Sequence, residues 1–229
     1  MTVGDARLRV LLIGHGRMGR LVEQLAGERG VDIVGHLTRN QASEATLPRA
    51  DVAIDFSTAE AVVVNAPRLA AQGMSLVIGT TGWQASEAQV RASVEAFPIG
   101  VIAAPNFAIG VNAFAAICER AAELLVRGHG FAPWIHEAHH AAKKDAPSGT
   151  AIALQRVIEA AGGKSVDVAS TRAGYIPGTH MVGFEGGGEG ITLTHTARDR
   201  TPFARGALEA ARWIKGRRGW FTMRDMLGL

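Results

Sequence analysis

Apolar residues in the first half of the chain form short, nearly continuous runs separated by longer segments with helical spacing. The runs predict strands at Leu8–Ile13, Val31–Leu37, Val52–Asp55, Ser75–Ile78 and Val101–Ala103. The segments between them predict helices at Arg17–Ala26, Ala59–Gln72 and Ser86–Phe97. Strands that are apolar at almost every position are typical of parallel sheets covered by helices on both faces. The alternation therefore predicts an α/β fold with a doubly wound parallel sheet.

The pattern changes after Pro105. Helices are predicted at Gly110–Val126 and Ala151–Ala161, strands at Val166–Ser170, Thr179–Phe184 and Ile191–Thr196, and a last helix from Pro202 to Lys215. This predicts a second, α+β domain with an open mixed sheet at residues 108–200. The first domain is predicted to hold residues 1–107, rejoined by residues 201–229.

Composition and charge exclude several classes of protein. Hydrophobic residues make up 47% and charged residues 20% of the 229 positions, which is typical of a compact globular protein. The formal net charge is +3, and the one dense basic run, at Arg212–Arg218, lacks a recognised motif that a base-reading surface would need. We expect no nucleic-acid or membrane partner. The mild positive charge suits a small anionic ligand.

Cysteine content and the N-terminus indicate the compartment. Cys118 is the only cysteine, so no disulfide framework can form within the chain. The charged residues Asp5, Arg7 and Arg9 precede an apolar run of four residues, Val10–Ile13, which is too short for a signal peptide. We therefore expect a cytoplasmic protein.

A glycine-rich turn follows the first predicted strand. Gly14, Gly16 and Gly19 form G-x-G-x-x-G between a strand and a helix, where glycines allow a tight turn, a close approach to a diphosphate and close packing. A purely structural turn is the alternative, but the position in a β-α-β series favours a dinucleotide and a Rossmann-type domain. The candidate cofactor residues of this turn are Gly14, His15, Gly16, Arg17, Met18 and Gly19.

Other strand ends add to the cofactor site. Thr38 and Arg39 stand where a ribose-binding carboxylate would lie, so NADPH should bind at least as well as NADH. A solvent-exposed arginine is the alternative reading of Arg39. Loops after the fourth and fifth strands should also face the cofactor, because ligands of such sheets bind at the carboxyl ends of strands. Their candidates are Gly79, Thr80, Thr81, Ala104, Pro105, Asn106 and Phe107.

Half of the eight histidines lie between residues 129 and 140. His136, Glu137 and His140 satisfy H-E-x-x-H, a motif in which two histidines on a helix bind zinc and the glutamate acts as a base. Local propensity allows a helix here. Gly130 and Pro147 confine it to about three turns, however, no third ligand is evident, and a zinc hydrolase would leave the glycine turn unexplained.

The same segment continues into an alternative site for an anion. Ser148 is a good N-cap for the next helix, so the backbone N–H groups near Gly149 and Thr150 should face an anion. His140 and Lys143 lie just upstream and could add charge-assisted hydrogen bonds. This interpretation expects a small anionic substrate and no metal.

The segment HHAAKKDAPSGTA resembles the signature of the 4-hydroxy-tetrahydrodipicolinate reductase (dihydrodipicolinate reductase) family. GRMG, VIGTTGW, PNFAIGVN, LTHTARDRTPFARGAL and FTMRDML extend the resemblance over nearly the whole chain. The resemblance implies NADH- or NADPH-dependent reduction of 4-hydroxy-tetrahydrodipicolinate, a cyclic dicarboxylate imine, to tetrahydrodipicolinate in lysine and diaminopimelate synthesis. It also implies that the histidine segment is a strand end and a loop.

Residue roles follow from the same resemblance. His139 matches the family's proton donor or acceptor, and Lys143 matches a second proton donor. Substrate-binding positions match His140, Gly149 and Thr150, and a substrate-side arginine matches Arg200. With Lys143 and the cap residue Ser148, these are the expected substrate-binding residues.

Three departures from the family limit the expectations. Thr38 replaces an acidic residue, which leaves the preference between NADH and NADPH open. The segment Thr171–His180 lacks about a strand and a loop that longer members carry, so their interface cannot be assumed, although a homo-oligomer, tetramer or dimer, is expected. Ala108 replaces a serine. The rival functions are a zinc hydrolase, a redox-sensing regulator that binds NADPH without turnover, and an amino-acid dehydrogenase.

Overall fold

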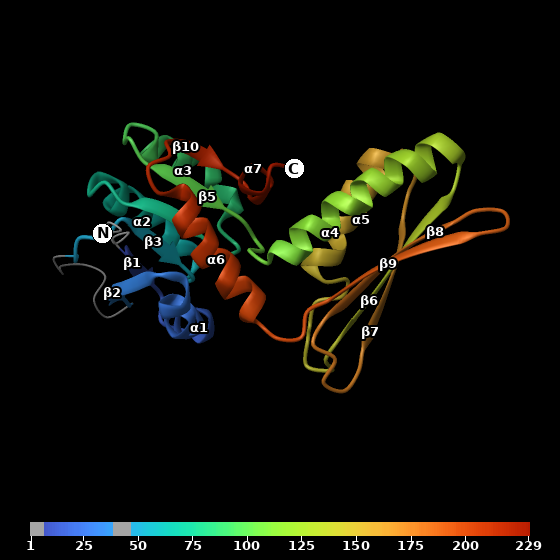
Figure 1. Ribbon diagram of the computed structural model, residues 1–229, viewed down its shortest axis with the longest axis horizontal. Helices are drawn as coiled ribbons and strands as arrows, with labels where there is room; N and C mark the ends of the chain where they lie inside the picture. Colours follow the sequence, from blue (N-terminus) through green and yellow to red (C-terminus); the bar gives the residue numbers. More distant parts are fainter. Residues whose placement is uncertain (1–6, 39–46) are drawn as a thin grey trace, which may run out of the picture. The chain divides into compact units, whose positions relative to one another are not determined.

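The computed structural model describes residues 7–38 and 47–229. The chain forms two compact units, Met1–Ile109 with Thr201–Leu229, and Gly110–Arg200 (Figure 1). The sequence predicted the first division after residue 107 and the second after residue 200.

A six-stranded parallel sheet lies at the centre of the first unit. Its strands are β1 (Leu8–Ile13), β2 (Val31–Leu37), β3 (Val52–Asp55), β4 (Ser75–Ile78), β5 (Gly100–Ala103) and β10 (Gly219–Phe221). Their order is β10-β5-β4-β3-β1-β2, and every neighbouring pair runs parallel. The predicted Rossmann-type sheet is therefore confirmed. The sequence prediction missed β10, which has only three residues.

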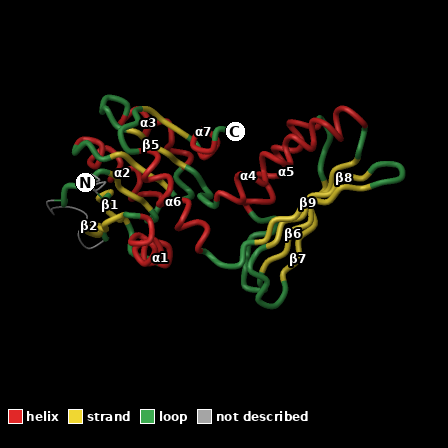
Figure 2. Tube along the Cα trace, in the orientation of Figure 1, coloured by secondary structure: helices red, strands yellow, loops and turns green. Residues whose placement is uncertain are grey.

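Helices cover both faces of this sheet (Figure 2). They are α1 (Arg17–Ala26), α2 (Ala59–Ala71), α3 (Glu87–Val94), α6 (Thr201–Ile214) and α7 (Met223–Leu227), with short 3₁₀ turns η1 (Gly27–Arg29) and η3 (Gln84–Ser86). Successive residues of β1 alternate between two cores: Val10 and Leu12 pack with residues of α1 and α6, and Leu11 and Ile13 with residues of α2 and α3. This period of two, buried on both sides, is why the strand is apolar throughout.

The second unit holds a four-stranded mixed sheet with helices on one face. Its elements are α4 (Ile109–Ala121), which continues as the π-helix η4 (Ala122–Arg127), then β6 (Ala132–His139), α5 (Gly149–Gly162), β7 (Asp167–Arg172), β8 (Thr179–Glu185) and β9 (Gly190–Thr196). The strand order is β7-β6-β8-β9, with β6 and β7 parallel and the other pairs antiparallel. Ile135, Val182 and Phe184 pack against Phe114 and Leu154 of the helices. The predicted open mixed sheet is confirmed.

Most of the histidine segment forms β6, one of the two inner strands of this sheet, and His140 follows its end. The H-E-x-x-H interpretation is therefore wrong, because successive residues of a strand point to opposite faces. His136 hydrogen-bonds Thr171 Oγ1 at 2.9 Å, while Glu137 is fully buried. Pairing of β6 with both β7 and β8 outweighs the local preference for a helix.

The longest continuous helical run is α4 followed by η4, with 13 and 6 residues, whereas a membrane-crossing helix needs about 20 apolar residues. Within residues 7–38 and 47–229, none of the helices is long and apolar enough to cross a membrane.

Candidate active site and cofactor loop

The three glycines of the turn after β1 have different surroundings. Gly14 has a φ of +85°, and a Cβ there would lie 2.6 Å from the carbonyl oxygen of Phe56. A Cβ on Gly19 would overlap the carbonyl oxygen of Gly14. Gly16 is different, because a Cβ there would have no atom within 4 Å among the described residues. Gly14 and Gly19 are thus required by the fold, whereas Gly16 leaves open space.

That open space lies at the N-terminus of α1. Gly16 is the N-cap residue and supplies no side-chain hydrogen bond to the first turn. The free N–H groups of a helix N-terminus attract anions. The turn therefore fits the diphosphate of a dinucleotide. Beside it, Arg17 is exposed and Met18 packs against the core.

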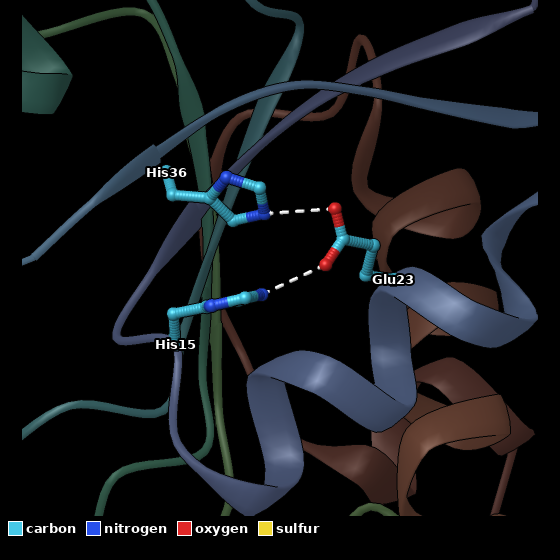
Figure 3. Close-up of side chains that lie close together, drawn as sticks. All are labelled: His15, Glu23 and His36. Atoms are coloured by element: carbon cyan, nitrogen blue, oxygen red, sulfur yellow. Dashed lines mark hydrogen bonds and ion pairs between the residues drawn. The ribbon is translucent and has the colours of Figure 1, made fainter.

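His15 makes a contact that the sequence did not indicate. Its Nε2 donates a hydrogen bond to Glu23 Oε2 on α1 at 2.7 Å, and His36 Nε2 on β2 lies 3.0 Å from Glu23 Oε1 (Figure 3). The hydrogen bond from His15 lowers the pKa of Glu23, and the proximity of His36 lowers it further. The carboxylate of Glu23 therefore lies between two imidazoles beside the glycine turn of residues 14–19.

Buried contacts with the end of β3 fix the loop after β4. A Cβ on Gly79 would overlap the ring of Phe56. Thr80 is buried, and its hydroxyl donates to Asp55 Oδ1 at 2.8 Å and accepts from the backbone N–H of Ser57 at 2.8 Å. Burial raises the pKa of Asp55 against the effect of these hydrogen bonds. The Thr80 hydroxyl thus fixes the loop, and the neighbouring Thr81 is exposed.

In the loop after β5, the side chains of Phe107 and Asn106 are engaged within the protein, so the loop would contact a cofactor mainly through its backbone. The Phe107 side chain is buried, with its ring edge-on to Phe56 at 6.4 Å between centroids. Asn106 Oδ1 accepts a hydrogen bond from the backbone N–H of Ala108 at 2.9 Å, and Pro105 is exposed. Ala104 packs on the core next to Phe107. Arg39 lies outside the described residues, so its role remains a prediction.

A buried carboxylate organises the second unit's site. Glu137 on β6 has no exposed surface; its Oε2 accepts a very short hydrogen bond from His139 Nδ1. Its Oε1 accepts from Arg172 Nη2 at 2.6 Å and from the backbone N–H of Ser148 at 3.3 Å. Burial alone would raise the pKa of Glu137, but hydrogen bonds from Arg172, Ser170 and His139 outweigh it and lower the pKa to about 2. Glu137 is therefore ionised at neutral pH.

The hydrogen bond to Glu137 uses Nδ1 of His139 and leaves the Nε2 edge of the ring available. A Cβ on Gly178 would lie 3.2 Å from His139 Nε2, so the glycine keeps space there. The ring of His180 stands edge-on to His139, 5.2 Å away. Burial lowers the pKa of His139, and the hydrogen bond to Glu137 acts against that shift. His139 thus has Nδ1 fixed and Nε2 available to exchange a proton.

The residues of the predicted anion site lie beside it. Ser148 caps α5 by accepting a hydrogen bond from the N–H of Ala151 at 3.2 Å. Lys143 Nζ lies 2.8 and 2.9 Å from the two carboxylate oxygens of Asp145. The hydrogen bond from Lys143 lowers the pKa of Asp145, and the backbone N–H of Gly149 contributes. Lys143 and the N-terminus of α5 thus already bind a carboxylate of this chain, the side chain of Asp145.

The remaining predicted substrate residues differ in accessibility. His140 and Thr150 are half-buried, and Gly149 is exposed. The Ser148 hydroxyl is buried and also hydrogen-bonds His180 Nε2 at 3.1 Å, so it belongs to the scaffold of the site. Arg200 is exposed, and no contact among the described residues ties it to the site.

Sequence reasoning missed three members of the site. Glu137 was considered only as a zinc-hydrolase base, although alternation in a strand places it on the same face as His139. The other two residues, Arg172 and His180, reach the site through strand pairing. Arg172 on β7 lies opposite His139 on β6, and His180 on β8 lies opposite Glu137 on β6. The local sequence around Arg172 or His180 carries no signal for this pairing.

Comparison with known proteins links both units to one family. Residues 8–107 match "Dihydrodipicolinate reductase, N-terminus", and residues 110–227 match "Dihydrodipicolinate reductase, C-terminus". The 4-hydroxy-tetrahydrodipicolinate reductase of Thiobacillus denitrificans is 36% identical, with 97% of this chain and 99% of the relative covered. That of Acidiphilium cryptum is 39% identical, with 99% and 100% covered.

Solved structures share the fold. A dipicolinate-bound dihydrodipicolinate reductase from Paenisporosarcina sp. TG-14 superimposes with a TM-score of 0.82 at 21% identity, covering 96% of this chain and 99% of that one. Aspartate dehydrogenase from Thermotoga maritima superimposes with a TM-score of 0.53 at 14% identity, covering 90% and 96%. The fold is thus shared with amino-acid dehydrogenases.

Proposed function

The chain belongs to the dihydrodipicolinate reductase family, and on this premise we propose that it reduces 4-hydroxy-tetrahydrodipicolinate to tetrahydrodipicolinate with NADH or NADPH. The substrate gains a hydride and a proton and loses water, while the nicotinamide is oxidised. The reaction belongs to lysine and diaminopimelate synthesis. The observation that carries this proposal is the His139–Glu137 pair beside a carboxylate-binding lysine and helix N-terminus.

The cofactor would be held by the glycine turn. Gly16 leaves space for the diphosphate of the cofactor at the N-terminus of α1, while Gly14 and Gly19 shape the turn. Bound there, the dinucleotide supplies the hydride. The other residues assigned to it are His15, Arg17, Met18, Arg39, Gly79, Thr80, Thr81, Ala104, Pro105, Asn106 and Phe107. Arg39 is assigned to the 2′-phosphate of NADPH.

Lys143 and the start of α5 would bind one carboxylate of the substrate. The substrate displaces Asp145, whose exposed side chain occupies the same donors. Gly149 and Thr150 then donate backbone N–H groups. We assign His140 to the same carboxylate and Arg200 to the second one.

Proton transfer would fall to His139, with Lys143 as a second donor. Hydride addition leaves negative charge on the substrate, which an acid must neutralise. Glu137 accepts the Nδ1–H of His139, so it fixes the tautomer and stabilises the charged imidazolium. Arg172 keeps Glu137 ionised despite its burial. Glu137 is thus a positioning residue.

Turnover of the expected substrate is the direct test. NADPH oxidation should begin when freshly formed condensation product of pyruvate and aspartate semialdehyde is added. Lys143→Ala should lower kcat by about 10² or more, as expected for loss of an acid and a carboxylate partner. Lys144→Ala is the matched control, because Lys144 is an exposed neighbour. NADPH binding without oxidation would instead indicate a regulator.

A two-point dicarboxylate site has its own test. Pyridine-2,6-dicarboxylate cannot accept the hydride, so it should compete with the substrate and stabilise the fold by about 2.7 kcal/mol at a hundred times its Kd. Picolinate has one carboxylate and should bind much more weakly. Equal binding of the two would refute the dicarboxylate site.

We also propose that the protein acts as a cytoplasmic homo-oligomer. The four-stranded sheet carries α4 and α5 on one face, and half-buried Trp134 and Met181 lie on strand positions that alternate with the buried Ile135 and Val182. The same face also carries threonines such as Thr192 and Thr194, and a second copy that covered Trp134 and Met181 would remove their apolar surface from water. Light scattering after size exclusion should give a mass of two or four chains, and a monomer would contradict the proposal.

A further inference from the structure

Three side chains from different elements meet beside the glycine turn. His15 lies in the turn, Glu23 in α1 and His36 in β2. Parallel pairing of β1 with β2 brings them together. Figure 3 shows both Nε2 atoms facing the carboxylate of Glu23, one at each oxygen. The proposed function assigns only His15, and only to the dinucleotide.

The spacing of these atoms matches a metal centre. The three potential ligand atoms all lie within 4.8 Å of one another, and the two nitrogen–oxygen distances are 2.7 and 3.0 Å. A metal with bonds of about 2.0–2.2 Å holds neighbouring ligand atoms roughly 3–3.5 Å apart. Small side-chain rotations would therefore complete the geometry.

His36 supplies an independent indication. Its Nε2 lies 3.0 Å from Glu23 Oε1 in an ion-pair contact, but this nitrogen has no partner among the described residues that meets the geometry of a hydrogen bond. The atom is also shielded from solvent. A buried polar atom without a partner is costly unless something binds it. A metal ion that accepts the imidazole lone pair would give this nitrogen a partner.

The other cluster of histidine and glutamate does not offer this. Glu137, His139 and His180 also lie close together, but the guanidinium of Arg172 already binds Glu137 Oε1 at 2.6 Å. The N–H of Ser148 binds the same oxygen. A cation already neutralises that carboxylate, whereas the partners of Glu23 are two imidazoles that can be neutral.

We propose that His15, Glu23 and His36 bind a divalent transition-metal ion of the zinc class. Two imidazoles and one carboxylate suit zinc, cobalt or nickel, whereas calcium and magnesium prefer oxygen ligands. The side chains are 31–40% exposed, so positions on the metal remain open to solvent. The ion would tie the glycine turn to α1 and β2 and add positive charge next to the diphosphate position.

Metal binding by the full-length, tag-free protein tests this site. After treatment with a chelator, calorimetric titration with Zn²⁺ should give one site per chain, and Co²⁺ should give the absorption bands of a nitrogen- and oxygen-ligated ion. His36→Gln and Glu23→Gln should each weaken Zn²⁺ binding by about tenfold or more. Circular dichroism checks that each variant folds.

Two controls separate this site from others. His129→Gln removes an exposed histidine elsewhere and should leave Zn²⁺ affinity unchanged. His180→Gln removes a member of the second cluster and should also leave it unchanged. The proposal is overturned by absence of stoichiometric binding, by unchanged affinity in folded His36→Gln and Glu23→Gln, or by loss of binding in His180→Gln. None of these outcomes depends on reductase activity.

Discussion

At the scale of single residues, the buried carboxylate of Glu137 determines how His139 can act. Arg172 and Ser148 hold one oxygen, and His139 holds the other. A buried charge is tolerated only where such partners compensate for lost hydration. The arrangement resembles a carboxylate that orients a catalytic imidazole, with a guanidinium keeping the carboxylate ionised.

Glu137→Gln should lower kcat by about 10², because the amide keeps the shape but loses the charge that supports imidazolium. The pKa of His139 should fall further, since Glu137 raises it, and the pH profile of kcat should shift to lower pH. The measurement is kcat and KM from acid to neutral pH.

Glu123→Gln is the control for this substitution, because Glu123 forms an exposed ion pair with Arg120. Its rate and pH profile should match those of the unmodified protein. A folded Glu137→Gln variant with an unchanged pH profile would refute the positioning role.

His139 should take up a proton when a dicarboxylate binds. Burial holds its pKa below the ordinary value of about 6.5 in the free protein, and two carboxylates nearby should raise it. Affinity for pyridine-2,6-dicarboxylate should therefore increase as pH falls through this range. Calorimetry in buffers of different ionisation enthalpy should detect proton uptake at neutral pH, and His139→Gln should abolish it.

At the scale of elements, the turn from β1 to α1 separates structural glycines from a ligand-facing one. Gly14 has positive φ and Gly19 touches the backbone of Gly14, so both serve the packing of strand against helix. Gly16 has ordinary backbone angles and open surroundings. The dinucleotide proposed above would account for its lack of a side chain.

Substitution should distinguish these roles. Gly16→Ala should change the free energy of unfolding by less than about 0.5 kcal/mol but weaken NADPH binding, because a methyl group enters the diphosphate position. Gly19→Ala should destabilise the fold by roughly 1–3 kcal/mol through overpacking. Urea unfolding and fluorescence titration with NADPH measure the two effects. Unaltered NADPH affinity in Gly16→Ala would contradict the assigned binding position.

At the scale of the whole molecule, buried titratable groups link stability to pH. Burial lowers the pKa of His180 to about 4, far below its unfolded value near 6.5. The unfolded chain then binds more protons than the folded chain between these values, so stability falls as pH drops through this window. Glu137 acts in the same direction at lower pH, because its pKa is about 2.

His180→Gln should reduce this acid sensitivity. The unmodified protein should lose about 2 kcal/mol more between pH 7 and pH 5 than the variant, because glutamine has no proton to bind. Urea unfolding at both pH values gives the difference. His129→Gln serves as the control, since His129 is exposed. Parallel pH curves for unmodified protein and His180→Gln would contradict burial of a neutral histidine.

The sequence by itself determined the elements whose signals are local. The runs of the first sheet, the glycine turn and the Ser148 cap are each encoded within a few neighbouring residues, because strand periodicity, positive φ and N-capping act over that range. The resemblance to the family signature likewise rests on neighbouring residues, and it predicted His139 and Lys143 as site residues.

Only the tertiary structure decided what depends on distant partners. The histidine segment became β6 because β7 and β8 pair with it, and that register placed Arg172 and His180 around Glu137. Likewise, β1–β2 pairing joined His36 to His15 and Glu23. Hydrogen bonds between strands far apart in sequence stabilise these contacts, so no local pattern of residues encodes them.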